Sequence, residues 1–133
     1  MILLDTTFLI DILKRRDNAI SKIIELSKEE KLATTYINIY ELLLGIYSIK
    51  DIYHERKLQD IEKLLERLEV FTLNKQSTIN SAKIGGGLAL KGQIIGDTDN
   101  MIAGIALANN INVLVTRDAE HFKRIEGIKV LTY

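Results

Sequence analysis

The sequence predicts an α/β fold: a single domain over residues 1–133, with helices flanking a central parallel sheet of about five short strands. Short apolar runs alternate with longer amphipathic stretches, and this alternation is typical of parallel sheets covered by helices. A length of 133 residues suits one domain with a real core. Neither a repeat nor a proline-rich linker divides the chain, which contains no proline.

The strands are expected where apolar runs of strand length carry β-branched residues. These runs are 2–4, 32–37, 69–73, 112–116 and 129–133. Helical patterns fill the intervals, over 7–16, 18–30, 39–49, 52–68, 77–91, 99–109 and 118–125. The stretch 52–68 shows the helical period best, because Ile61, Leu64 and Leu68 share one face opposite the charged residues.

One expected helix contains an unusual cluster of glycines. Gly85, Gly86 and Gly87 lie in the interior of 77–91, where each disfavours a helix by about 1 kcal/mol relative to alanine. We expect a kink, mobility or a close packing contact there. A phosphate-binding loop is disfavoured, because its pattern needs serine or threonine after the lysine, and Lys91 is followed by glycine.

The composition excludes several classes of protein. Eighteen basic and eighteen acidic residues give no net charge that would favour one kind of partner. The absence of cysteine excludes disulfides, thiolate zinc sites and a cysteine nucleophile. Two histidines leave little room for a histidine-rich metal cluster, so a metal would lie among oxygen ligands. The first residues lack the pattern of a signal peptide, and Glu41 interrupts the longest apolar window. We therefore expect a cytoplasmic protein without a membrane span.

Acidic residues occupy four junctions between strands and helices. Asp5 follows the first expected strand, Glu41 the second and Asp118 the fourth, and Asp99 opens the helix that leads into the fourth. In open α/β sheets, sites lie at the carboxyl ends of the strands. Helix capping is the alternative for each acid taken alone, and residues 38–41 have the form of a capping box with Asn38 as the cap.

The surroundings of two acids favour a site over a cap. Glu41 is the only charged side chain between residues 32 and 49, so we expect it to point into a buried region. Asp99 begins the apolar stripe that continues through Ile102 and Ala103, and is expected to point inward. Asp97 lies about 200° from Asp99 around a helix and is expected to start it. A metal-binding role for Asp97 is kept as an open alternative.

Four converging acids need a positive counterpart. Two like charges about 4 Å apart repel by roughly 4 kcal/mol at an effective dielectric near 20. Only Arg117 is close by in the segments at the sheet edge. A hard divalent cation, Mg²⁺ or Mn²⁺, fits an all-oxygen site better, and such sites support hydrolysis of phosphate esters.

The chain resembles the PIN-domain ribonucleases, in particular the VapC toxins of toxin–antitoxin pairs. The resemblance covers essentially the whole chain; it lies in LLDTTFLID at the start, the isolated Glu41, and above all the block from Asp99 to Phe122 with its TRDAEHF. It implies an acidic quartet of Asp5, Glu41, Asp99 and Asp118, with Asp5 and Asp99 as the direct Mg²⁺ ligands. Thr6 and Thr116 match the small hydroxyl positions beside the metal.

The same resemblance implies an endonuclease that acts on RNA, a homodimer, and inhibition by a small VapB-type antitoxin whose tail enters the groove of the active site. Three alternatives stay open. A PIN-like module could bind RNA or a partner without cutting, and the same acids could serve a DNA-directed or exonucleolytic enzyme. A receiver-like signalling domain is the third, although the sequence lacks that class's paired acid after the first strand.

The remaining candidates are assigned simpler roles. The basic cluster 14–16 is interpreted as a solvated helix end, with RNA contact as the alternative. His54 and His121 are expected at the surface and outside the site. Tyr36, Tyr40 and Tyr47 are expected to pack against the sheet or on a dimer surface, and part of the apolar segment 42–49 to be covered by a partner chain.

Overall fold

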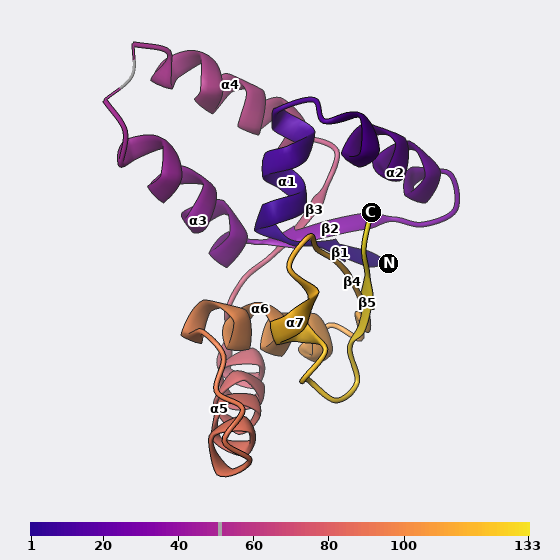
Figure 1. Cartoon of the computed structure of the whole chain (residues 1–133), viewed down its shortest axis with the longest axis vertical. Coiled ribbons are helices and arrows are strands. Elements are labelled where there is room, and N and C mark those ends of the chain that lie inside the picture. Colours follow the sequence, from indigo (N-terminus) through magenta and orange to yellow (C-terminus); the bar gives the residue numbers. More distant parts are fainter. Residues whose placement is uncertain (51) are drawn as a thin grey trace.

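The computed structural model describes residues 1–50 and 52–133. Its strands are β1 (Ile2–Leu4), β2 (Leu32–Thr35), β3 (Glu69–Phe71), β4 (Val113–Val115) and β5 (Lys129–Leu131). Its helices are α1 (Thr6–Leu13), α2 (Asp17–Ser27), α3 (Tyr36–Tyr47), α4 (His54–Leu65), α5 (Lys75–Leu90), α6 (Asp97–Ala108) and α7 (Ala119–Phe122). The predicted α/β fold is confirmed, with each expected strand and helix in its place (Figure 1).

The strands form one parallel sheet in the order β3-β2-β1-β4-β5. The chain builds outward from β1 to β2 and β3, then crosses to the other side of β1 for β4 and β5. The order therefore reverses between β1 and β4, which pair with Leu3 opposite Leu114 and Leu4 opposite Val115. Such a reversal opens a crevice at the carboxyl ends of the two strands.

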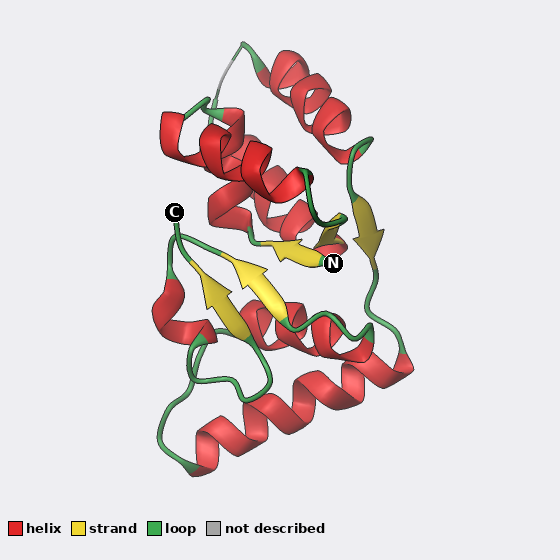
Figure 2. Cartoon of the chain, turned by 90° about the vertical axis from the view of Figure 1, so that its right-hand side faces the viewer, coloured by secondary structure: helices red, strands yellow, loops and turns green. Residues whose placement is uncertain are grey.

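Helices cover both faces of the sheet. Successive side chains of each strand point to opposite faces and pack against these helices. Leu3 and Leu114 pack into a core with residues of α5, α6 and α7. Ile2, Leu4 and Val115 point the other way, into a core with residues of α1, α2, α3 and α4. The result is a layered α/β/α arrangement (Figure 2). No helix in the described ranges is long and apolar enough to cross a membrane.

The close packing of α5 against α6 positions the start of α6. A side-chain carbon on Gly104 would meet the backbone oxygen of Ser77 at 2.8 Å, so only glycine allows this approach. One on Gly85 would meet Asn100 Nδ2 at 2.9 Å, whereas nothing lies within 4 Å of such an atom on Gly86 or Gly87. Close packing therefore explains one glycine of the cluster, and α5 runs as one helix through all three.

The capping box before Glu41 was assigned wrongly from the sequence. Helix α3 begins at Tyr36, and its N-cap is Thr35, whose hydroxyl accepts from the Asn38 backbone N–H at 3.2 Å. Asn38 Oδ1 accepts in return from the Thr35 N–H at 3.2 Å. The helix starts directly from the end of β2, so the box lies three residues earlier than predicted. Glu41 consequently lies in the second turn and is free of a capping role.

Candidate active site

A pocket of about 270 Å³ lies at the carboxyl ends of β1 and β4, where the sheet order reverses. It is lined by Asp5, Thr6, Thr7, Glu41, Thr98, Asp99, Asp118, His121 and Phe122. The four acids expected to form a quartet thus share one pocket. Asp97 is the first residue of α6; it is exposed and stands outside the residues that line this pocket.

Asp5 forms the buried floor of the pocket, with 5% of its surface exposed. Its Oδ2 accepts from Thr116 Oγ1 at 2.7 Å and from Thr7 Oγ1 at 3.1 Å, and its Oδ1 accepts from Asn38 Nδ2 at 3.3 Å. Burial raises the pKa of Asp5; these hydroxyls oppose the rise, and the Asp99 charge adds to it. Among the ion pairs of the described residues, none involves Asp5.

Glu41 forms the wall of the pocket on the α3 side. Thr6 Oγ1 donates to its Oε1 at 2.6 Å, and Thr98 Oγ1 donates to its Oε2 at 3.4 Å. Burial raises the pKa of Glu41, and the charges of Asp5 and Asp99 raise it further. Asp5 and Asp99 therefore lie within electrostatic reach of Glu41.

Asp99 faces the pocket from the first turn of α6, where His121 Nδ1 contacts its Oδ2 at 2.8 Å. The expectation that His121 lies outside the site was therefore wrong: its side chain is 41% exposed, yet it lines the pocket. A local signal was available, because His121 follows Asp118 by three residues at the start of a helix, which places both on one side of its first turn.

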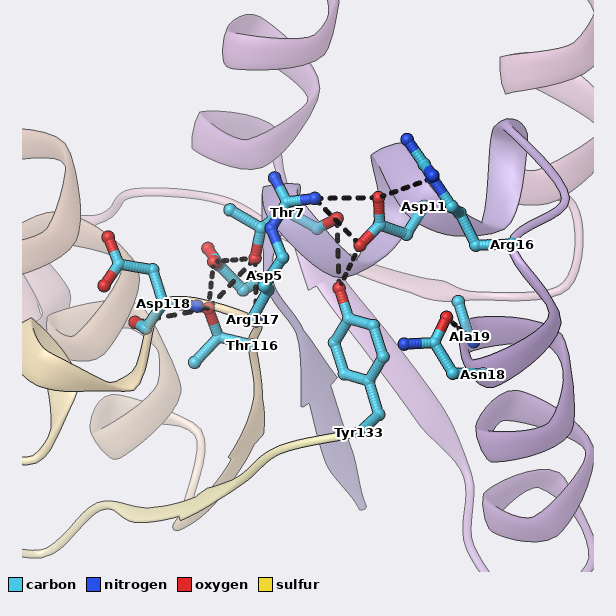
Figure 3. A network of polar contacts seen from close by, with 10 residues as sticks. All are labelled: Asp5, Thr7, Asp11, Arg16, Asn18, Ala19, Thr116, Arg117, Asp118 and Tyr133. Atoms are coloured by element: carbon cyan, nitrogen blue, oxygen red, sulfur yellow. Dashed lines mark hydrogen bonds and ion pairs between the residues drawn. The ribbon is translucent and has the colours of Figure 1, made fainter.

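Asp118 occupies the N-cap position of α7 at the exposed rim of the pocket. Its backbone N–H donates to Thr116 Oγ1 at 3.1 Å, and its backbone oxygen lies 3.4 Å from the same hydroxyl. The carboxylate takes part in neither bond, and Figure 3 shows it on the far side of Thr116 from helix α1. Thr116 thus ties the backbone of Asp118 to the buried carboxylate of Asp5.

The chemistry of this donor set fits a hard divalent cation, since carboxylate and hydroxyl oxygens predominate. Asp5 and Glu41 form no ion pair with the residues that the structure describes. Over residues 1–50 and 52–133, no group of three or more acidic or histidine side chains is arranged as a metal cage. Mg²⁺ does not require one, because it is commonly bound through one or two carboxylates and keeps several waters.

Comparison with known proteins gives consistent matches over the whole chain. The model of the PIN domain family matches residues 2–128. The tRNA(fMet)-specific endonuclease VapC of Salmonella typhimurium is 33% identical over 128 residues, which cover 96% of this chain and 94% of that protein. Ribonuclease VapC1 of Haemophilus influenzae is 30% identical over 128 residues, covering 96% and 93%.

A solved structure matches equally fully. VapBC2 of Rickettsia felis, bound to a DNA fragment from its promoter, superposes with a TM-score of 0.89. The identity is 29%, and the match covers 100% of this chain and 99% of the other.

Proposed function

The chain belongs to the PIN domain family, and from that premise we propose that it is a metal-dependent endoribonuclease, the toxin of a toxin–antitoxin pair. The observation that carries the proposal is the pocket that Asp5, Glu41 and Asp99 line together, in which burial and the neighbouring carboxylates raise the pKa of Asp5 and of Glu41. The similarity to endonuclease and ribonuclease VapC proteins supports RNA as the substrate.

We propose Asp5 and Asp99 as the residues that would hold Mg²⁺ or Mn²⁺. A bound cation of this kind neutralises charge on a phosphodiester and lowers the pKa of a coordinated water. The chain's own groups prepare the site: the hydroxyls of Thr7 and Thr116 fix the rotamer of Asp5, and His121 fixes that of Asp99.

Glu41 and Asp118 are assigned to the attacking water. Glu41 is half-buried, and its raised pKa makes it a stronger base than an ordinary glutamate, so it suits orienting a water and accepting its proton. Asp118, at the exposed rim, has a carboxylate available for the same water or for the metal's remaining ligands. Asp97 is kept as a further metal candidate, with a smaller expected contribution because it lies outside the pocket.

The proposed partners are RNA, a cognate VapB-type antitoxin and a second copy of this chain. The antitoxin is supported by the match to the VapBC2 complex. The homodimer is supported by α3, where Tyr36, Tyr40 and Tyr47 are 58%, 56% and 62% exposed. This exposure contradicts their expected packing against the sheet and is compatible with a dimer surface or with stacking on RNA bases. An RNA substrate also supports the expected cytoplasmic location.

Membership of the PIN family removes the receiver-like alternative. A PIN-like module that binds without cutting is the remaining rival, and cleavage of total RNA separates the two. The purified chain, free of antitoxin, is incubated with total RNA in Mg²⁺ or Mn²⁺ and in EDTA. We expect internal cuts that require the metal.

The Asp99→Asn variant should abolish these cuts. A matched control is Asp17→Asn, which removes an acid from the first turn of another helix, outside the pocket, and should cut like the wild type. A well-folded wild-type chain that cuts no RNA with either metal would contradict the proposal and favour the binding module. Release of mononucleotides from the RNA ends would favour an exonuclease.

A further inference from the structure

Helix α1 carries a second buried carboxylate outside the pocket, Asp11, which is 3% exposed. Arg117 Nη1 donates to both of its oxygens, at 2.9 Å to Oδ1 and 3.1 Å to Oδ2. The Tyr133 phenol donates to Oδ2 at 2.6 Å, and Arg16 Nε lies 3.9 Å from Oδ1. Three segments distant in sequence therefore meet on this one carboxylate (Figure 3).

Arg117 stands in the chain between Thr116, whose hydroxyl donates to Asp5, and Asp118, which lines the pocket. Its backbone N–H donates to Thr7 Oγ1 at 3.0 Å, and that oxygen lies 3.0 Å from Thr116 Oγ1. The loop 116–118 is thus attached to α1 at two levels. Hydroxyl contacts hold it beside the pocket, and the guanidinium holds it at Asp11, further along the helix.

Tyr133 closes the remaining side of this carboxylate. Its ring packs on Phe8 with the centroids 4.6 Å apart, and its hydroxyl also lies within 3.4 Å of the Thr7 backbone oxygen. Burial, and then the contact with Asp11, raise the pKa of Tyr133, so the phenol stays a hydrogen-bond donor at neutral pH. Tyr133 thus holds the Asp11 carboxylate on the C-terminal side, in addition to the contact with Arg117.

We propose that Arg117 is a positioning residue: its ion pair with Asp11 fixes the loop 116–118 against α1, and so sets the Thr116 hydroxyl on Asp5 and Asp118 at the pocket rim. This inference rests on the proposed ribonuclease function. An ion pair that only stabilised the chain would leave the rate of cleavage alone. A pair whose arginine lies between two site residues links the geometry of the site to the anchor at Asp11.

The two arginines beside Asp11 provide a matched comparison. Their side chains are 57% and 61% exposed, but only Arg117 belongs to the loop. We expect Arg117→Gln to lower kcat by about ten- to a hundredfold with little change in KM, because a displaced site residue loses reaction geometry rather than binding. Arg16→Gln should leave kcat unchanged. The substrate is a short RNA taken from a site that the wild type cuts.

The double variant identifies the partner through which Arg117 acts. Asp11→Asn should lower kcat as Arg117→Gln does, and the two changes together should cost no more than either alone, because both break the same contact. A direct contact between Arg117 and RNA predicts instead a higher KM for Arg117→Gln, a near-normal Asp11→Asn and additive losses. That pattern would overturn the inference while leaving the ribonuclease proposal intact.

A readout that needs no cleavage keeps the two proposals separate. Amide hydrogen exchange, followed by NMR, reports directly on the bonds of the loop backbone at residues 117 and 118. We expect Arg117→Gln to lose protection at these amides, with β1 unchanged, and Arg16→Gln to keep it. Unchanged loop protection in Arg117→Gln would overturn the positioning role. A wild type that cuts no RNA would overturn the proposed function alone.

Discussion

The molecule holds two buried aspartates close together around α1, and their surroundings differ in kind. Asp5 and Asp11 are 5% and 3% exposed. Asp11 is matched by the guanidinium of Arg117 and by a phenol. Among the residues that the structure describes, Asp5 receives only hydroxyl and amide donors, and Asp99 adds a like charge. Within the described residues, the charge of Asp11 is therefore neutralised by a cationic side chain, and the charge of Asp5 is not.

This difference separates a structural acid from a reactive one. A buried ion pair with good hydrogen bonds holds segments together. A buried acid without a counter-charge destabilises the fold, and such acids are found mainly at functional sites. The charge of Asp5 lies at the crevice where the sheet order reverses, which is where α/β proteins bind their ligands. The contrast supports the proposal that a cation binds at Asp5, and that Asp11 is a structural anchor.

The largest expected effect is on cleavage. Asp5→Asn should lower the rate by about a hundred- to a thousandfold, the size typical of losing one electrostatic group at a reacting centre. The shape of the side chain is kept, so circular dichroism should show an unchanged fold. Cleavage rates on the same RNA with Mn²⁺ measure the loss. Activity of Asp5→Asn within a few-fold of the wild type would contradict the assignment of Asp5 as the reactive aspartate.

The next effect is on stability, and it concerns the other aspartate. Asp11→Asn removes the charge that Arg117 and Tyr133 bind, and should lower the free energy of unfolding by about 1 to 3 kcal/mol. The loss is limited because the Arg117 side chain is 57% exposed and returns to water. Urea unfolding of the wild type and the variant measures it, and equal midpoints would contradict the structural role.

The same substitution at Asp5 should have the opposite sign in EDTA. An asparagine oxygen can still accept from Asn38, and its amide can donate to the hydroxyls of Thr7 and Thr116 once they rotate. The buried charge is gone, so Asp5→Asn should unfold at an equal or higher temperature than the wild type. A large drop in the melting temperature would show that the charge of Asp5 stabilises the fold.

The pH dependence sharpens this point. The pKa of Asp5 is raised above its ordinary value of 3.8 in the folded chain. The folded chain therefore holds the Asp5 proton more tightly than the unfolded chain does. Below 3.8 both states are protonated and ionisation costs nothing; above it the cost grows until the folded carboxyl has also ionised. The advantage of Asp5→Asn over the wild type should therefore grow as the pH rises, in melting curves recorded without metal. An advantage that shrinks would contradict the raised pKa.

The fold, and the meeting of the four acids in one pocket, could be predicted from the sequence for a physical reason. Strand ends and helix starts are local patterns, and a parallel sheet brings the carboxyl ends of its strands to one edge. The contacts that complete the site are not local. Arg117 and Asp11 are separated by 106 positions, and Tyr133 and Asp11 by 122, so no local pattern links them. Thr7 was missed for the same reason, since its partner Thr116 lies elsewhere in the chain. For His121 the spacing from Asp118 was a local signal, but its partner Asp99 is 22 positions away.

The smallest expected effect is a change in the stability of α5 alone, and it serves as a control for the other variants. Gly86→Ala, where a side chain meets open space, should stabilise α5 by about 0.5 to 1 kcal/mol, while Gly85→Ala should gain nothing because it presses on Asn100. Neither change alters a charge near Asp5 or Asp11. Cleavage by Gly86→Ala should therefore equal that of the wild type, which shows how activity responds to stability alone. Chemical unfolding of both variants provides the comparison.

We propose that the carboxylate of Asp5, which forms no ion pair with the described residues, binds a divalent cation. The most direct test of this binding is a calorimetric titration of the antitoxin-free chain with Mn²⁺. The contrast between the two aspartates predicts saturable binding that is lost in Asp5→Asn and kept in Asp11→Asn. Equal binding by wild type and Asp5→Asn, or no binding by a folded wild type, would contradict it.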